Sequence, residues 1–189
     1  MRMKISSILP SCLAALVLAT FTATGFAQEK IWHVKAFLPE GGQLDVKAFD
    51  KEGKPHAVKA IETDGNLHLL DIKALFGDQK YPVKILVSDD ANMPVKAIGD
   101  DGAVYDIKAV TADGKKLDIK GVKRAGSIIH IKALGPNGVF YGVKAISPEG
   151  RVYDVKGIKM LKEREETKVN GVSVAAHIKA LPQAPEVVK

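Results

Sequence analysis

The stretch Val95-Lys96-Ala97-Ile98-Gly99-Asp100-Asp101-Gly102-Ala103-Val104-Tyr105-Asp106 is one full copy of a repeat that fills the chain after residue 30. In each copy an apolar residue, Lys, a small residue and an apolar residue precede turn formers, Gly and an apolar or aromatic residue. Eight of the ten spacings between successive repeat lysines up to Lys156 are twelve residues. The lysines concerned are Lys35, Lys47, Lys59, Lys73, Lys84, Lys96, Lys108, Lys120, Lys132, Lys144 and Lys156, and Lys179 closes the series. A fixed period indicates a repeated structural unit.

Each copy also contains one signal for a chain reversal. In Ser147-Pro148-Glu149-Gly150, as in most copies, Gly follows the lysine by six residues. Proline suits the second position of a type I turn, and glycine suits the left-handed residue of a G1 bulge. Twelve residues are too few for a solenoid coil, which needs about 20. The pattern therefore predicts an all-β fold, an antiparallel meander of about 12 strands rolled into a barrel or a sandwich.

The turn type also predicts which residues face each other. With Gly99 opposite Ala103, Lys96 lies opposite Asp106 and Val95 opposite Ile107. The same count pairs Lys35 with Asp45, Lys108 with Asp118 and Lys144 with Asp154. Opposite charges directly across two strands stabilise the pair by roughly 0.2 to 1 kcal/mol. We therefore expect a ladder of Lys and Asp on one face of the sheet and Val, Ala and Tyr on the other.

This ladder has two interpretations. It is a charged face that water covers, or it is also a binding surface for an extended, periodic ligand, because it offers the same groups at each strand spacing of about 4.8 Å. The single Trp32 either caps an open edge of the sheet or stacks on a sugar ring. The candidate binding residues are Lys35, Lys96, Lys108, Lys144, Asp106, Asp118, Asp154 and Trp32.

The first 27 residues have the pattern of an export signal. Arg2 and Lys4 precede a mainly apolar stretch, and small residues end at Ala27, where we expect cleavage. We assign residues 28–181 to a single β-repeat domain and residues 182–189 to a disordered tail. The only cysteine, Cys12, lies in the signal, so the mature chain is expected to form no disulfide. These features predict a periplasmic or secreted protein.

Composition argues against nucleic-acid binding and against a transmembrane helix in the mature chain. The net charge is +6, two charges of it from Arg2 and Lys4, and the basic residues are spread along the repeat instead of clustered. Nucleic acid is therefore not expected as a partner. After the signal no apolar run approaches the 18 residues of a transmembrane helix.

Two regions depart from the repeat. Residues 62–82 contain extra residues, which predicts a place where the sheet bends or divides. The stretches 32–36 and 176–180 resemble each other, so we expect the two ends of the sheet to meet and remove its free edges. Asn170-Gly171 is a strong signal for a two-residue hairpin.

No pattern in the chain indicates catalysis, a cofactor or a metal site. His33, His130 and His177 each stand two residues before a repeat lysine, where Asp is usual, so we interpret them as polar members of the ladder. A metal site shared by His33 and His177 is the alternative, although the lysines opposite them would repel a cation. No serine lies in a nucleophile motif, and every glycine of the repeat stands alone at a turn.

The motifs Val-Lys-Ala-Ile, Pro-Glu-Gly and Tyr-Asp-Val-Lys, repeated over residues 31–181, resemble an uncharacterised family of small exported bacterial proteins with twelve-residue repeats. The resemblance implies no activity and no functional residue. We predict a soluble, non-enzymatic protein with a structural or binding role in the cell envelope or outside the cell, whose partner is envelope polysaccharide or another envelope protein. The alternatives are an outer-membrane β-barrel, which alternates apolar and polar residues in the same way, and an enzyme.

Overall fold

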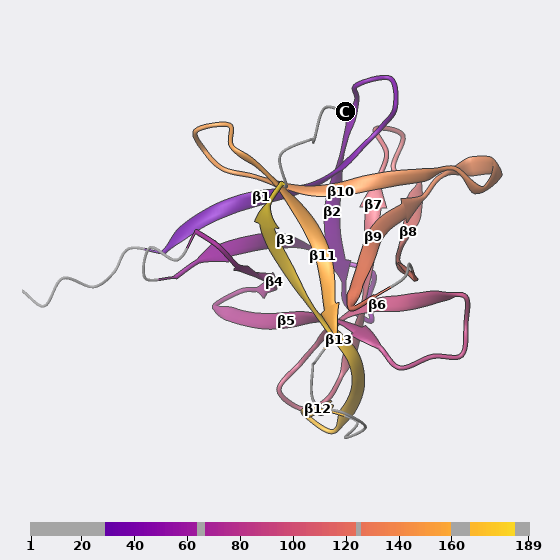
Figure 1. Ribbon diagram of the computed structural model, residues 1–189. Coiled ribbons are helices and arrows are strands. Elements are labelled where there is room, and N and C mark those ends of the chain that lie inside the picture. Colours follow the sequence, from indigo (N-terminus) through magenta and orange to yellow (C-terminus); the bar gives the residue numbers. More distant parts are fainter. Residues whose placement is uncertain (1–28, 64–66, 124–125, 160–166, 184–189) are drawn as a thin grey trace, which may run out of the picture.

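A computed structural model describes residues 29–63, 67–123, 126–159 and 167–183 (Figure 1). These residues form antiparallel strands and one short 3-10 turn, Pro136–Gly138, so the prediction of an all-β fold is confirmed. The strands are β1 Lys30–Phe37, β2 Gln43–Phe49, β3 Pro55–Glu62, β4 Leu70–Phe76, β5 Gln79–Leu86, β6 Asn92–Ile98, β7 Val104–Val110, β8 Lys116–Lys123, β9 Ile128–Leu134, β10 Phe140–Ile146, β11 Val152–Lys159, β12 Thr167–Val169 and β13 Val172–Pro182. The predicted export signal lies outside the described residues. At the other end, β13 includes Pro182, the first residue assigned to the tail, and residues 184–189 are not described.

The hairpin turns have the predicted geometry. Between β6 and β7 the Gly99 N–H donates to the Ala103 carbonyl at 2.8 Å, and the Gly102 N–H donates to the Gly99 carbonyl at 3.0 Å. Gly102 has φ of +80°, which a residue with a side chain rarely adopts. Asn170 and Gly171 both have positive φ and form the predicted tight hairpin between β12 and β13.

The predicted register holds only from the turn to the lysine. Lys96 lies opposite Asp106 and Ala97 opposite Tyr105, as expected. The pairing of Val95 with Ile107 is wrong, because β6 and β7 separate beyond Lys96 and Pro94 pairs with β8 instead. Hairpins such as β6–β7 and β7–β8 therefore open at their lysines to admit a third strand. The hairpins β3–β4, β5–β6 and β8–β9 instead stay paired past their lysines.

Twelve strands meet three at a time in four places, which we call junctions A to D. Junction A joins β1, β2 and β3; B joins β6, β7 and β8; C joins β9, β10 and β11; and D joins β4, β5 and β13. Six further pairs connect the junctions: β1 with β10, β2 with β7, β3 with β4, β8 with β9, β5 with β6 and β11 with β13. Every junction is connected once to each of the others, as the corners of a tetrahedron are.

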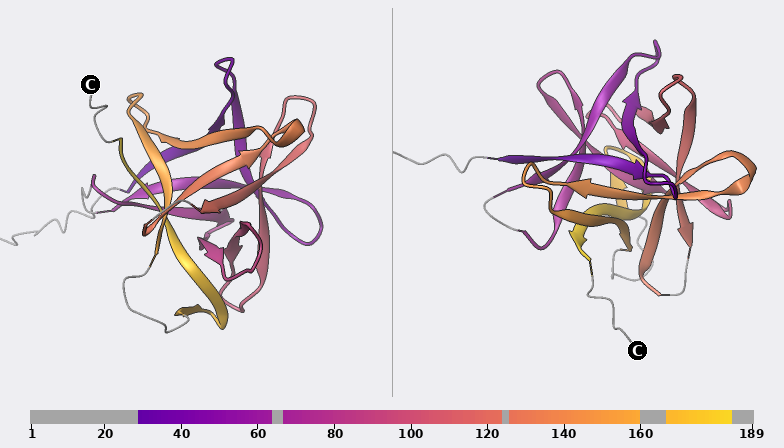
Figure 2. Two further views of the ribbon diagram at one scale, coloured as in Figure 1. Left: turned by 45° about the vertical axis from the view of Figure 1, so that its right-hand side comes forward. Right: turned by 90° about the horizontal axis from the view of Figure 1, so that it is seen from above.

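This connectivity closes the meander into a 12-stranded barrel, since each of the twelve strands has partners on both edges. Figure 2 shows the consequence: the hairpin turns point outward in several directions instead of gathering at two ends. The bends lie at all four junctions and are not confined to residues 62–82. The expected meeting of the two ends is wrong. β1 pairs with β2, β3 and β10, whereas β13 pairs with β4, β5, β11 and β12.

The side chains beside each lysine fill the barrel. In most strands the residue before the lysine is Val or Ile and the residue after it is Ala, and both are buried, as Val95 and Ala97 show. β5 differs, because Ile85 follows Lys84 and is fully buried. Its side chain lies against Gly121 and Gly157, where an added Cβ would crowd it. The apolar face of the repeat is thus the inside of the barrel.

Candidate functional site: four lysine triads

Each junction gathers three repeat lysines on the outside of the barrel, and we call each group a lysine triad. The triads are Lys35, Lys47 and Lys59 at junction A; Lys96, Lys108 and Lys120 at B; Lys132, Lys144 and Lys156 at C; and Lys73, Lys84 and Lys179 at D. In the pairs that connect junctions, lysine stands opposite lysine, as Lys47 does opposite Lys108. The continuous ladder predicted from the repeat is therefore replaced by four separate cationic clusters.

Within a junction, each lysine faces the residue that stands two places before the lysine of another strand. At junction A these facing residues are Asp45, His33 and Ala57. Junctions C and D repeat this composition, with Asp154, His130 and Gly142 at C and Asp71, His177 and Pro82 at D. Junction B has two carboxylates, Asp106 and Asp118, and Pro94. Among these facing residues, three junctions therefore set one carboxylate against three lysines.

Junction A shows how the three positions differ. Lys35 forms an ion pair with Asp45, and Lys47 approaches the second carboxylate oxygen at 3.6 Å. Lys59 donates to Nδ1 of His33 at 2.9 Å. The positive charge of Lys59, burial and Lys35 lower the pKa of His33, so the ring stays neutral and accepts this hydrogen bond. Burial, Lys47 and Lys35 in turn lower the pKa of Lys59, because one carboxylate does not balance three ammonium groups.

Junction D holds the most buried lysine of the triads. Lys84 is 8% exposed, and its amino group contacts Nδ1 of His177. Burial lowers the pKa of Lys84 to about 8, although Asp71 acts in the opposite direction, and Lys179 and Lys73 lower it further. Asp71 itself is held by an ion pair with Lys179. Burial and Lys84 lower the pKa of His177, so this ring is also neutral.

At junctions B and C one carboxylate contacts two lysines at once. At B, Asp106 bridges Lys96 and Lys108, and a hollow of about 30 Å³ lies between the three strands, enough for about one water molecule. At C, Asp154 forms ion pairs with Lys144 and, at 3.1 Å, with Lys156. Burial raises the pKa of Asp154, but hydrogen bonds from these lysines outweigh it and bring the pKa to about 2.

The predicted binding residues lie in different parts of the structure. The pairs of Lys35 with Asp45, Lys96 with Asp106, Lys108 with Asp118 and Lys144 with Asp154 form as predicted, but they belong to junctions A, B and C and not to one surface. The interpretation of Trp32 as a surface residue is wrong. Its side chain is fully buried, so it can neither stack on a ligand at the surface nor cap an open edge. Its Nε1 donates to Glu62 at 3.2 Å, and its ring packs on Tyr153.

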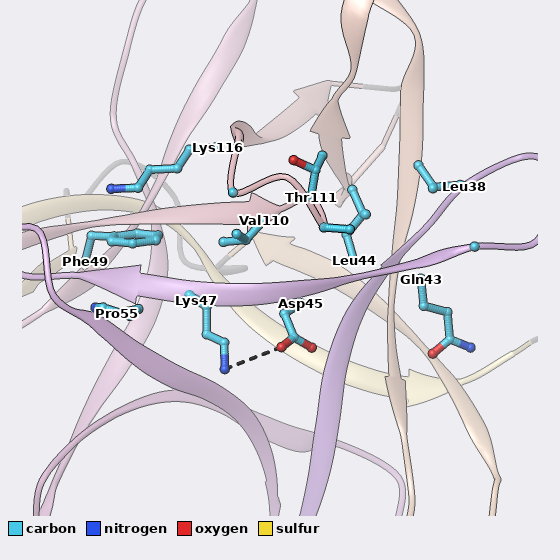
Figure 3. A pocket seen from close by; sticks show the side chains of 13 residues that line it. Leu38, Gln43, Leu44, Asp45, Lys47, Phe49, Pro55, Val110, Thr111 and Lys116 are labelled. Carbon is cyan, nitrogen blue, oxygen red and sulfur yellow. Dashed lines mark ion pairs between the residues drawn. The ribbon is translucent and has the colours of Figure 1, made fainter.

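A groove that the repeat does not predict runs along β2 beside junction A (Figure 3). Its volume is about 710 Å³, within the usual range for small-molecule sites. The apolar lining residues are Leu38, Leu44, Phe49, Pro55, Val110 and Ala112, and the charged ones are Asp45, Lys47 and Lys116. Its walls include turns 38–42 and 111–114, whose residues vary from copy to copy of the repeat. The groove could therefore be predicted only from the antiparallel pairing of β2 with β7.

The described residues do not bring together the side chains of a metal site. These residues contain no group of three or more His, Cys, Asp and Glu side chains that could hold a metal ion. His33 and His177 belong to different junctions, so the shared metal site considered above is wrong. In the same residues no helix is long and apolar enough to cross a membrane.

Comparison with known proteins places the chain in a family without assigning an activity. Neither the search of curated proteins nor the search of solved structures found a match. The profile of one family, described as a family of unknown function (DUF7486), matches residues 28–181, which are nearly all of the repeat region. The chain therefore belongs to the family of unknown function DUF7486.

Proposed function

We propose that this protein is exported and soluble and that it binds an anionic polysaccharide of the cell envelope or the extracellular space through its lysine triads. The observation that supports this most directly is the excess of lysine over carboxylate at junctions A, C and D. Each of these faces offers uncompensated positive charge where a fold stabilised only by ion pairs would carry two further Asp residues.

One lysine in each triad faces Ala, Pro or Gly, which have no polar side chain. Lys47 faces Ala57, and Lys120 faces Pro94. Lys73 faces Pro82 and Lys132 faces Gly142 in the same way. A carboxylate, sulfate or phosphate group of a ligand would take the place of the absent side chain and accept charge-assisted hydrogen bonds.

Four such sites on different sides of one barrel suit a repeating ligand. Surface ion pairs are individually weak, about 0 to 1 kcal/mol each. A polymer that reaches two or more sites gains from the high effective concentration of its second charged group. The same arrangement allows one protein molecule to connect separate polysaccharide chains.

The distribution of side chains supports the soluble interpretation over an outer-membrane barrel. A membrane barrel carries its apolar residues outward. Here Val95, Ala97 and their equivalents are buried inside the barrel. The triad lysines lie on the outside, and those that form ion pairs have 19 to 34% of their side chains exposed. A lipid-facing surface would require the reverse pattern.

Binding is tested with the protein purified after expression of the full chain with its own export signal. Polygalacturonate is the anionic probe and dextran the neutral one. The variant replaces by Gln the four lysines that face Ala, Pro or Gly, which are Lys47, Lys73, Lys120 and Lys132. The control replaces four exposed lysines outside the triads, Lys51, Lys54, Lys115 and Lys168, by Gln. Both variants lose the same charge.

The proposal expects sedimentation with polygalacturonate that weakens as salt rises, no binding to dextran, and at least a tenfold larger loss of affinity in the triad variant than in the control. Equal losses in the two variants, or equal binding to double-stranded DNA, would contradict recognition by the triads. Capture of an envelope protein instead of the polysaccharide would favour the other class of partner.

Localisation is tested separately by cell fractionation and alkaline carbonate extraction of the membranes. The proposal expects the tagged protein in the periplasm or the culture fluid. Retention in the outer membrane after extraction would overturn the soluble interpretation and favour the membrane barrel.

A further inference from the structure

The groove along β2 differs from the triads in its chemistry. In Figure 3 Lys116 and Phe49 lie at one end and Leu38 at the other, with Val110 and Leu44 between them on the same side of the strand. The floor is formed by side chains that pack into the fold, since Leu44 and Phe49 are only 7% and 9% exposed. An elongated apolar surface therefore runs between two hairpin turns and ends at a cation.

The charged group at that end is available to a ligand. Lys116 is an exposed residue whose Nζ lies 3.8 Å from the centroid of the Phe49 ring, which holds it over the groove. Within the part of the chain that the structure describes, Lys116 belongs to no ion pair. Asp45 also lines the groove, but Lys35 and Lys47 already bind its two oxygens, and in Figure 3 it points to the opposite side of β2 from Leu44.

We infer that this groove binds an amphipathic anion, an unbranched acyl carboxylate, with its carboxylate at Lys116 and its chain along Val110, Leu44 and Leu38. The apolar floor removes the chain from water, which stabilises the complex in proportion to the apolar area buried. Lys116 supplies the complementary charge. The carboxylate accepts a hydrogen bond from the ammonium group, and the Phe49 ring shields that contact from water on one side.

The test measures binding of sodium dodecanoate to the full-length protein by isothermal titration calorimetry below the micellar concentration. Dodecyltrimethylammonium has the same chain and the opposite charge, and butyrate has the same head group and almost no chain. Lys116→Gln removes the cation. Lys115→Gln is its matched control, since Lys115 is the neighbouring residue, is also exposed and does not line the groove. Thermal unfolding verifies that each variant folds.

We expect one dodecanoate per protein, no measurable binding of butyrate or the quaternary ammonium ion, an affinity about tenfold weaker in Lys116→Gln, and an unchanged affinity in Lys115→Gln. Equal affinities of the two variants, or equal binding of the two twelve-carbon probes, would overturn the assignment of Lys116. Absence of dodecanoate binding to the unmodified protein would overturn the site itself. These measurements do not depend on polysaccharide binding by the triads.

Discussion

Junctions B and D have the same backbone plan but different charge environments. Junction B consists of three consecutive strands from the most regular part of the repeat, whereas junction D combines β4 and β5 with β13 from the end of the chain. Both bring three lysines together. At B two of the lysines face Asp106 and Asp118, while at D Lys84 faces His177.

The balance between burial and nearby carboxylates determines the pKa of each of these lysines. Burial lowers the pKa of Lys108 at junction B, but hydrogen bonds and charges from Asp118 and Asp106 outweigh it, so its pKa is raised. At junction D burial outweighs the attraction of Asp71, and the pKa of Lys84 is about 8. The comparison teaches that the repeat sets the geometry of a junction, whereas burial and the number of carboxylates among the facing residues set the charge balance of its lysines.

The largest effect is expected from Ile85, the one large residue that distinguishes the interior beneath junction D. Ile85→Ala should lower the free energy of unfolding by about 3 kcal/mol, since it opens a cavity beside Gly121 and Gly157. Urea unfolding measures it. Adding Gly157→Ala, which restores the usual residue of the repeat, should recover part of the loss. If the double variant is less stable than Ile85→Ala alone, the complementarity of these positions is refuted.

Removing the charge of Lys84 should stabilise the protein at neutral pH. Its folded pKa of about 8 lies below the ordinary 10.5, so the unfolded chain binds more protons between these values and stability rises with pH across this window. Lys84→Met should therefore gain about 1 to 3 kcal/mol at pH 7 and lose that advantage by pH 10. Urea unfolding at both pH values measures the difference. A constant difference would show that Lys84 titrates normally.

The sequence predicted the local parts of the fold. The turn geometry around Gly102, the cross-strand contact of Lys96 with Asp106 and the division of each strand into an apolar and a charged face depend only on residues within one hairpin, and all were confirmed. These features follow from backbone conformation and from the two-residue periodicity of a strand.

The way hairpins combine could not be predicted in the same manner. Nothing within one repeat shows that β6 leaves β7 at Lys96 and continues beside β8, because that choice depends on contacts between distant strands. The lysines therefore looked like one ladder, Trp32 looked accessible, and the groove beside Phe49 was missed. The histidines at 33, 130 and 177 were read correctly as members of the charged face, but their pairing with a lysine required the junctions.

Replacing the histidine of junction D by an aspartate, as in junction B, tests the comparison of the two junctions directly. His177→Asp places a carboxylate opposite Lys84, which should raise the pKa of Lys84 toward 10.5 and increase stability at pH 7 by about 1 kcal/mol. Two-dimensional NMR of the lysine side chains follows the titration. Asp118→His in junction B is the reciprocal variant and should lower the pKa of Lys108. Titration of Lys84 still near pH 8 in His177→Asp would show that burial alone determines it.

The smallest effect is expected where junction B is already balanced. Hydrogen bonding from Lys96, together with the charges of Lys96 and Lys108, holds the pKa of Asp106 below its ordinary value near 3.8. Its ionised form therefore stabilises the folded protein above pH 4, and this contribution is lost as the pH falls below 4. Because the carboxylate is nearly half exposed, Asp106→Asn should cost only about 0.5 kcal/mol at pH 6 and less at pH 3. Urea unfolding of both proteins at these two pH values measures the difference. A cost that persists unchanged at pH 3 would mean that Asp106 stabilises junction B by its shape and not by its charge, and the contrast with junction D would then have to rest on Asp118 alone.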